Sequence, residues 1–445
     1  MPPGPRYPRL IQTLGWATRG GPFLERCRAR YGDMFTLRIA QEGNWVMLAD
    51  PELVKQVFTG DPAVYHAGEG NEILLPVVGP NSVLLLDDQP HMRQRKLLLP
   101  PFHGERMQRY GEIMDRAARE EIERWPFDEP FELLPRMQAV TLEVILKAVF
   151  GFVEGARLEE MRVRLRRMLK HSTDASTWAL LALIGPHRAA RLPIVRRQIA
   201  PVDELIAEEI AERRSQGDLS ERDDILSLLL AARHEDGSPM SDDELRDELV
   251  TLLVAGHETT ATALSWSLER LVRHPEKLDR LRAEVAAGEE DDYLDAVIKE
   301  TLRVRPVLHV VVRKLTEAVE LGGHTLPAGT RVVPCIHLVH RRDDLYPDPH
   351  AFRPERFLGV SPGTYNWIPF GGGVRRCLGA SFALFEMKRV LGAVVMSVEL
   401  EPAEPSFEPA RRRAITLTPS RGASVVVRPG AEPAGAGSSL AAAQA

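Results

Sequence analysis

The feature that most constrains the fold of this chain is a long helical segment without a proline, from residue 241 to residue 274. It opens on Ser241-Asp242-Asp243-Glu244, the pattern of a capping box, which predicts the first helical turn at this point. At 1.5 Å per residue, the predicted helix is roughly 50 Å long. A helix of that length crosses a whole domain, so the remaining elements have to pack around it.

The centre of this predicted helix contains residues that oppose helix formation. It reads Ala255-Gly256-His257-Glu258-Thr259-Thr260, and glycine and threonine each cost up to about 1 kcal/mol relative to alanine. Gly256 permits close approach of another group, and the Thr259 hydroxyl can donate to the carbonyl oxygen of Ala255 and loosen the helix. Two interpretations fit the segment: a kink in the core with a solvated Glu258, or an acid and alcohol pair formed by Glu258 and Thr259.

A second feature is the glycine-rich stretch WIPFGGGVRRCLGA, residues 367 to 380, which ends where a helical pattern begins. At a helix start, unpaired N–H groups and the positive dipole end favour the thiolate of Cys377 over the thiol, and a thiolate can bind a soft metal. Glycines such as Gly371 and Gly379 remove Cβ atoms around the sulfur, so a flat iron macrocycle could approach the main chain. The alternative is a glycine-rich turn beside a cysteine that packs as a small hydrophobic residue.

The composition excludes several classes of protein. The 445 residues are 44% apolar and 27% charged, as in soluble globular proteins of one large domain or two to three smaller ones. The net charge of -6 gives no reason to expect nucleic-acid binding. The three cysteines are far apart and form no CxxC pair, which favours a reducing compartment, and we expect a cytoplasmic protein. The N-terminal residues lack a signal-peptide pattern, and the longest apolar run, residues 178 to 184, is too short to span a bilayer, so no membrane anchor is expected.

The patterning along the chain predicts a mainly α protein with small β-sheets (α+β). We expect a proline-rich surface segment over residues 1 to 20, a short helix from Pro22 to about Tyr31, and almost continuous helix from 105 to 235. Asp50-Pro51 is typical of a helix start, and the glycines and prolines from Thr59 to Asp88 predict a long loop. The alternating segments 34 to 40 and 45 to 49, separated by Glu42-Gly43-Asn44, predict a β-hairpin. Further predicted strands are residues 307 to 312, 331 to 334, and several within 397 to 427. Residues 429 to 445 have no core-forming pattern, which predicts a disordered tail.

Two pairs of charged residues at helical spacing are further candidates. His91 and Arg95 are four residues apart on one face of a basic helix. That face is either a solvated cationic surface or a site for carboxylates, which suit the fork of an arginine. Glu300 and Arg303 are three apart and can form an ion pair, which would contribute little if exposed.

Several of these motifs together resemble one known family. The order F-G-x-G-x-R-x-C-x-G resembles the ligand loop of the cytochrome P450 superfamily, the haem-thiolate monooxygenases; it is filled here by Phe370, Gly371, Gly373, Arg375, Cys377 and Gly379. A-G-x-[DE]-T at residues 255 to 259 is similar to that family's oxygen-activation motif, and E-x-x-R followed by P-E-R-F resembles its scaffold helix and the segment after it. Five motifs stand in family order from residue 91 to residue 379, which is most of the chain.

The resemblance implies a single large haem domain over residues 21 to 428, with a long central helix and haem b as cofactor. It implies that Cys377 is the axial thiolate ligand, and that Glu258 and Thr259 organise the water that delivers protons. It implies contacts with the haem propionates from His91, Arg95, Arg313 and Arg375, although Arg313 could also be a surface arginine at the end of a plain strand. The implied cofactor-binding set also contains Ala255, Gly256, Phe370, Gly371 and Gly379, and the implied buried scaffold beneath the cysteine loop is Glu300, Arg303 and Arg356.

The activity implied by the resemblance is insertion of one oxygen atom from O2 into a C–H or C=C bond of a hydrophobic small molecule, such as a fatty acid, terpenoid, steroid or polyketide. Candidate pocket segments are residues 65 to 86, 172 to 186, 250 to 255 and 307 to 312. The second of these is equally well interpreted as an ordinary connection between two helices.

We expect no reductase domain after the haem domain, so the electrons are expected from a separate donor such as a ferredoxin with its reductase. Its docking surface is predicted at Arg93, Lys96, Arg375, Arg376 and Lys388. The alternatives are a peroxygenase driven by hydrogen peroxide, against which the intact Glu258-Thr259 pair argues, and a haem- or lipid-binding protein without turnover. Oxygen uptake that depends on NAD(P)H, redox partners and a ligand distinguishes the three.

Overall fold

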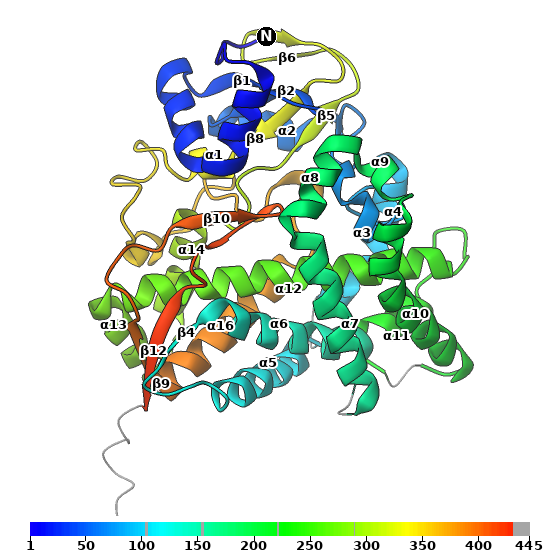
Figure 1. Ribbon diagram of the computed structural model, residues 1–445, viewed down its shortest axis with the longest axis vertical. Coiled ribbons are helices and arrows are strands. Elements are labelled where there is room, and N and C mark those ends of the chain that lie inside the picture. Colours follow the sequence, from blue (N-terminus) through cyan, green and yellow to red (C-terminus); the bar gives the residue numbers. More distant parts are fainter. Residues whose placement is uncertain (103–105, 153–154, 220–221, 289, 430–445) are drawn as a thin grey trace, which may run out of the picture.

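The molecule is built around α12, Asp242–Val272, which runs through the middle of the structure (Figure 1). We analysed a computed structural model that describes residues 1 to 102, 106 to 152, 155 to 219, 222 to 288 and 290 to 429. The predicted capping box is present: the Ser241 side chain accepts a hydrogen bond from the Glu244 N–H, and the Glu244 side chain accepts one from the Ser241 N–H. With 31 residues the helix is about 46 Å long, which confirms the predicted long central helix.

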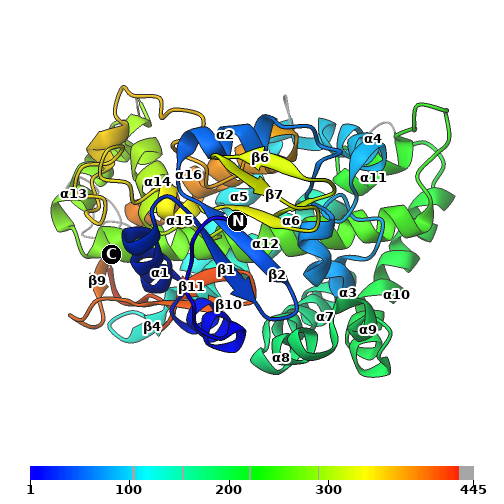
Figure 2. The ribbon, with the colours of Figure 1, turned by 90° about the horizontal axis from the view of Figure 1, so that it is seen from above.

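The other helices surround α12 on most sides (Figures 1 and 2). Those before α12 are α1 Arg9–Tyr31, α2 Pro51–Thr59, α3 Leu75–Val78, α4 Asp88–Leu98, α5 Arg106–Ile122, α6 Leu133–Phe150, α7 Ala156–Thr173, α8 Ala175–Ile184, α9 Pro186–Ala189, α10 Pro193–Ser215 and α11 Ile225–Ala231. Those after it are α13 Pro275–Ala287, α14 Asp292–Val304, α15 Ile336–Val339 and α16 Ala380–Ser397.

The strands form small sheets at the edges of this helical body. One sheet has the order β1-β2-β8-β5-β3 and lies with α1 at one end of the molecule (Figure 1); its strands are β1 Met34–Ile39, β2 Gly43–Leu48, β8 Arg331–Pro334, β5 Arg313–Leu315 and β3 Tyr65–His66. A second sheet has the order β4-β12-β9, from β4 Pro130–Glu132, β12 Ser424–Pro429 and β9 Val398–Pro402. Two hairpins complete the set, β6 Val319–Leu321 with β7 His324–Leu326, and β10 Ala410–Arg413 with β11 Thr416–Pro419. The predicted fold class, mainly α with small sheets, is confirmed.

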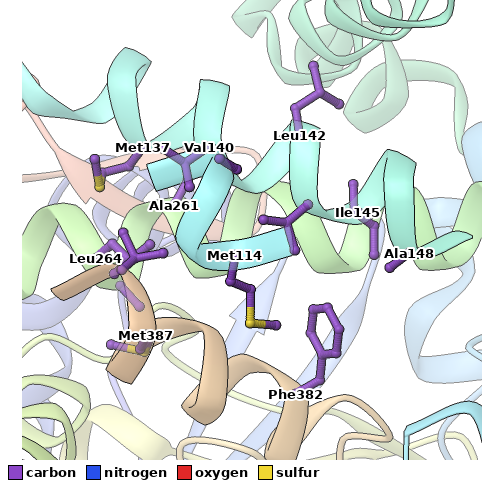
Figure 3. Packing of buried hydrophobic residues seen from close by; sticks show 14 of the residues in the cluster. Met114, Met137, Val140, Leu142, Ile145, Ala148, Ala261, Leu264, Phe382 and Met387 are labelled. Atoms are coloured by element: carbon purple, nitrogen blue, oxygen red, sulfur yellow. The ribbon is translucent and has the colours of Figure 1, made fainter. Parts of the chain in front are cut away.

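The main hydrophobic core lies where α5, α6, α12 and α16 meet. Figure 3 shows Met114 of α5 pointing toward Phe382 of α16, and Ile145 of α6 belongs to the same cluster. Leu264 on α12 is fully buried in this cluster. Burying a side chain of this size stabilises the fold by about 1.5 to 3 kcal/mol, so the core fixes α16, and the loop that leads into it, against α12.

The structure corrects the prediction for the N-terminus. Residues 9 to 20 are helical, since α1 begins at Arg9, whereas we expected no helix before Pro22. The helix is kinked at Arg19, whose backbone has φ -135° and ψ 41°. Two glycines and Pro22 follow, so the second half of α1 begins near the predicted position. The first half packs because Gln12 is buried and donates to the carbonyl oxygens of Pro5 and Tyr7, a contact that no sequence period reveals.

Three other predictions need correction. Residues 307 to 312 do not form a strand: Leu308 makes an isolated bridge to Thr416, and the strand begins at Arg313. The predicted connection at 172 to 186 is largely a helix, α8, because the stretch ASTWALLALI has no residue that breaks one. The long loop predicted from residue 59 to residue 88 contains β3, a 3₁₀ turn and α3. The predicted tail lies outside the described residues from 430 onward, while Pro429 still pairs with Val398 in β12.

Within the part of the chain that the structure describes, no helix combines the length and the apolar character needed to cross a bilayer.

Candidate active site

The glycine-rich loop that carries Cys377 packs against α2. Gly371 and Gly373 have φ values of +66° and +64°, which glycine adopts without steric cost. A Cβ atom at Gly373 would collide with the carbonyl oxygen of Phe58 in α2, so the close approach of the two backbones requires glycine there. The Cys377 N–H donates to the carbonyl oxygen of Phe370 at 3.0 Å and closes the loop. The loop therefore holds the cysteine in place just before α16.

Cys377 is accessible, whereas the other two cysteines, Cys27 and Cys335, are buried. Surrounding protein raises the pKa of the Cys377 thiol by desolvation, and the Gly379 N–H together with the guanidinium groups of Arg95 and Arg376 lowers it. A coordinating cation deprotonates a thiol of this kind outright. The accessible sulfur and its adjoining cationic groups thus suit a metal-bound thiolate.

Four cationic or titratable side chains predicted to bind propionates lie near one another. His91 is buried, and its pKa falls to about 3, first because of burial and then because of Arg375, Arg95 and Arg313. Burial is also the first cause that lowers the pKa of Arg313 and of Arg375 to about 10 each. These side chains come from α4, the start of β5 and the cysteine loop, and they lie close enough to shift one another's pKa values.

The carboxylate partner of this group is Asp87, which the sequence analysis missed. Arg375 Nη2 lies 2.5 Å from Oδ1 of Asp87, and Arg375 Nη1 donates to the carbonyl oxygen of Val83 at 3.1 Å. The Asp87 carboxylate also accepts backbone N–H groups from residues 67 to 69. The position of Asp87 just before a helix was the only feature of the sequence that could have pointed to it. Among the described residues, Asp87 makes the one ion pair with this cationic group, so the group has an excess of positive charge that further carboxylates could neutralise.

The centre of α12 presents a short accessible face. Ala255 is exposed and Thr259 is half-buried, although the helix is buried for most of its length. As predicted, the Thr259 hydroxyl donates to the Ala255 carbonyl oxygen, at 2.6 Å. The Cβ direction of Gly256 points instead at Ile145 of α6, 3.0 Å away. The group whose close approach this glycine permits is therefore a side chain of the neighbouring helix.

Glu258 points away from Thr259. Its Oε2 accepts a hydrogen bond from Nε2 of Gln138 in α6 at 2.7 Å, and its Oε1 lies 3.5 Å from Nη1 of Arg413 in β10. The carboxyl group is buried. The structure thus does not pair the acid with the alcohol directly. Gln138 and Arg413 are contacts that sequence reasoning missed, because 120 and 155 residues separate them from Glu258.

The predicted scaffold residues come together in the core. Arg303 donates to both carboxylate oxygens of Glu300, at 2.7 and 2.8 Å, and both side chains are fully buried. Arg356 Nε lies 3.4 Å from Oε1 of Glu300. Nearby, Nε1 of Trp367 donates to the carbonyl oxygen of Lys299, which ties the start of the cysteine loop to α14. The helix that carries the buried ion pair is therefore bonded to the segment that leads to Cys377.

This chain belongs to the cytochrome P450 family, whose model matches residues 1 to 426. It is 45% identical over 438 residues to a protein of Mycobacterium tuberculosis named putative cytochrome P450 135B1, covering 96% of this chain and 91% of the relative. Another protein of that organism, named putative cytochrome P450 137, is 38% identical over 435 residues, with the same coverage of each. The solved structure of retinoic acid bound cyanobacterial CYP120A1 superposes with a TM-score of 0.83 at 25% identity, over 96% of this chain and 99% of that one.

Membership of the family defines the class of enzyme. The protein is a haem monooxygenase, an oxidoreductase that uses O2 and a separate electron donor, and its cofactor is haem b with a cysteine thiolate as axial ligand. The accessible thiol at the start of α16 and the cationic excess beside it fit such a group and its two carboxylates.

Proposed function

We propose that this enzyme hydroxylates or epoxidises a hydrophobic small molecule and that Cys377 supplies the axial thiolate. One observation carries the assignment: Cys377 is the accessible cysteine among the three, and it stands between the loop held by α2 and the start of α16. When bound, the haem supplies the chemistry that inserts one oxygen atom into the substrate, and the thiolate donates electron density to it. The protein residues supply binding, orientation and protons.

His91, Arg95, Arg313 and Arg375 are proposed to bind the two propionates. Their local excess of positive charge supports this role, because a buried cationic group needs counter-charges. His91 can donate a hydrogen bond from a ring nitrogen, while each guanidinium presents several donors. Four further residues of the cofactor-binding set are proposed to face the macrocycle, and these are Ala255, Phe370, Gly371 and Gly379. Gly256 is not proposed in this role, because its Cβ direction points at Ile145 of α6.

Thr259 and Glu258 are proposed to move protons by different routes. The Thr259 hydroxyl lies on the accessible face of α12 and is oriented by the Ala255 carbonyl oxygen, so it can hold a water molecule there. Glu258 lies on the far side of the helix, fixed by Gln138 and Arg413. A proton that travels from Glu258 to the Thr259 side therefore has to pass through water, because the two side chains make no direct contact.

Glu300, Arg303 and Arg356 are proposed as a scaffold with no contact to substrate. Their ion pairs and the bond from Trp367 to α14 support this structural role. Residues 21 to 428 are proposed as the catalytic domain. Since α1 begins at Arg9 and continues past residue 20, part of the N-terminal segment packs with that domain.

The substrate class rests on the apolar character of the candidate pocket segments, residues 65 to 86, 172 to 186, 250 to 255 and 307 to 312. The cyanobacterial relative is solved with retinoic acid, a largely apolar molecule, which supports a hydrophobic ligand. A fatty acid, terpenoid, steroid or polyketide fits this description. Screening such compounds for a shift in the spin state of the haem would identify the class.

The electron donor is proposed to be an acidic ferredoxin, served by its reductase. Of the five basic residues predicted as its docking surface, three make ion pairs in the structure: Lys96 with Glu235, Lys388 with Asp291, and Arg375 with Asp87. Arg93 and Arg376 are exposed and make no ion pair with any described residue. The proposed docking surface for the electron donor is therefore centred on these two arginines.

The spectrum of the reduced, carbon monoxide-bound protein tests the assignment of Cys377. The wild type should show the long-wavelength band of thiolate ligation, the Cys377→Ser variant should lose it, and the control Cys27→Ala should keep it. An unchanged band in Cys377→Ser would refute the assignment. Turnover with O2 and reduced donor, compared with turnover driven by hydrogen peroxide alone, separates the monooxygenase from a peroxygenase.

A further inference from the structure

A separate cavity of about 630 Å³ lies on the α6 side of α12. Its walls come from the end of α5, from α6 and α7, from His257 and Glu258 of α12, and from Arg413 of β10. None of the residues proposed to contact the haem lines it. Figure 1 shows α6 and α7 beside α12 in this part of the molecule. The cavity is thus distinct from the haem site, although Glu258 forms part of its wall.

The lining of this cavity is strongly cationic. Five of its side chains are positive, namely Arg124, Arg136, Arg166, Lys170 and Arg413, and two are carboxylates, Glu121 and Glu258. His257 is buried, and burial together with Arg166 and Arg413 lowers its pKa to about 3, so it is neutral. The lining residues therefore have an excess of three positive charges at neutral pH.

The two carboxylates do not saturate these cations. Glu121 lies 3.3 Å from Arg136 and 3.9 Å from Arg124. Glu258 and Arg413 are 3.5 Å apart, and Oε1 of Glu258 is buried without a hydrogen bond. Arg413 is half-buried and donates from Nη2 to Oγ1 of Thr173 at 3.1 Å. A guanidinium has five N–H donors, so most of the donors of Arg413 remain available.

Arg166 and Lys170 have no carboxylate within ion-pair distance among the residues that the structure describes. Both are exposed residues of α7, four residues apart, with the buried Leu169 between them in the lining. Residues at this spacing share one face of a helix, and that face is turned to the cavity. Unpaired like charges that converge on one cavity repel each other, and a bound anion would remove the repulsion.

We propose that this cavity binds a small multivalent oxyanion, a compound with phosphate or carboxylate groups, held by Arg166, Lys170 and Arg413. The planar fork of an arginine matches phosphate and carboxylate oxygens, and a lysine adds a point charge. The cavity falls within the size range of small-molecule sites, about 300 to 1,000 Å³, and is larger than inorganic phosphate requires. The ligand is therefore a polyanion such as a diphosphate ester or a tricarboxylate, and not the hydrophobic substrate.

Binding is tested on the haem-loaded protein, in which the propionates occupy the other cationic group. Pyrophosphate and citrate serve as probes, each titrated by calorimetry and by thermal melting, with sodium chloride at equal ionic strength as reference. Pyrophosphate and citrate distinguish phosphate from carboxylate recognition. We expect saturable binding of at least one probe, and a higher melting temperature than chloride produces.

Variants locate the binding site. The double variant Arg166→Gln with Lys170→Gln should bind at least about tenfold more weakly, which is a loss of one decade in Kd. Arg167→Gln is the matched control, because Arg167 is exposed on the same helix, as Arg166 and Lys170 are, but does not line the cavity. This control variant should bind the probes as tightly as the wild type does. The carbon monoxide spectrum of each variant verifies folding, and the single variants Arg166→Gln and Lys170→Gln replace the double variant if it does not fold.

Two results would overturn the proposal: neither probe stabilises the protein more than chloride does at equal ionic strength, or the cavity variants bind a probe as tightly as Arg167→Gln does.

Discussion

The Thr259 hydroxyl lies 2.6 Å from the carbonyl oxygen of Ala255, one turn earlier in α12. This bond places an accessible hydroxyl in the middle of a helix that is otherwise mostly buried. A threonine that bonds backward in this way loosens the helix and fixes its own side chain. Because the same hydroxyl is proposed to position a water molecule, its removal should change the chemistry more than the fold.

Replacing Thr259 by Ala should divert electrons to hydrogen peroxide, because the water that delivers protons loses its partner. We expect a severalfold higher ratio of peroxide to product, with the carbon monoxide spectrum unchanged. Thr259→Ser is the control, since it retains a hydroxyl at the same place. Peroxide and product are measured per NAD(P)H consumed, and a ratio equal to that of the wild type would contradict the proton role.

Replacing Arg303 by Met should lower the free energy of unfolding by about 3 to 5 kcal/mol, because it leaves the Glu300 carboxylate buried without its main partner. Lys299→Met on the same helix is the matched control. Lys299 pairs with Asp295 at a partly exposed position, where such a pair contributes about 0 to 1 kcal/mol. Denaturant unfolding of both variants measures the difference. Equal losses of unfolding free energy would show that the buried Glu300 pair contributes no more to stability than the partly exposed pair does.

The stability of the protein should depend on pH through Glu248. Burial, with help from Asp247 and Glu244, raises the pKa of Glu248 to about 8, while the Val83 N–H lowers it. Between its ordinary pKa of 4.5 and about 8, the folded state keeps this carboxyl protonated and the unfolded state does not. The folded state then binds more protons, so its contribution to stability falls as the pH rises.

Glu248→Gln mimics the protonated acid and can still accept from the Val83 N–H. Between pH 5 and pH 8, the free energy of unfolding of this variant should fall less than that of the wild type. Denaturant titration at several pH values measures both. Parallel curves for the two proteins would show that Glu248 does not titrate in this window.

Replacing Arg95 by Met should accelerate haem loss, because Arg95 belongs to the cationic group proposed to hold the propionates. The rate of haem transfer to apomyoglobin measures the effect, and we expect about a tenfold increase for the loss of one charge-assisted contact. Arg93→Met is the control, since Arg93 lies on the same helix but is exposed. Equal transfer rates in the two variants would argue against a propionate contact from Arg95.

Electron transfer from an acidic donor should weaken as salt rises, because exposed charges are screened over about 10 Å at 0.1 M ionic strength. Arg376→Gln should raise the KM for the donor severalfold, whereas Lys388→Gln should change it less, since Lys388 already pairs with Asp291. The carbon monoxide spectrum of Arg376→Gln verifies that Cys377 is unaffected. Turnover that is the same at low and high salt would exclude this docking surface.

Local patterns predicted those parts of the molecule that depend on neighbouring residues in the chain. The capping box at Ser241, the side-chain cap of Asp50 on α2, and the backward bond of Thr259 each join atoms only two to four residues apart. The hairpin of β1 and β2 was likewise predicted from its alternating residues and short turn. Such features are specified by chain geometry alone.

The long-range parts of the site required the folded chain. Sequence spacing grouped Glu258 with Thr259, yet adjacent residues on a helix point in different directions, and only tertiary packing brought Gln138 and Arg413 to Glu258. The same reason explains Asp87, which meets Arg375 across 288 residues.

The sequence by itself determined the chemistry that this protein can perform, because the identity and order of Cys377, Thr259 and the charged residues are written in local motifs. Tertiary structure decided which of those residues share an environment, which arginines remain unpaired, and where α7 and β10 form a cationic cavity beside α12. The physical reason is that burial and electrostatic pairing depend on distances in space. The separation of two residues along the chain does not determine those distances.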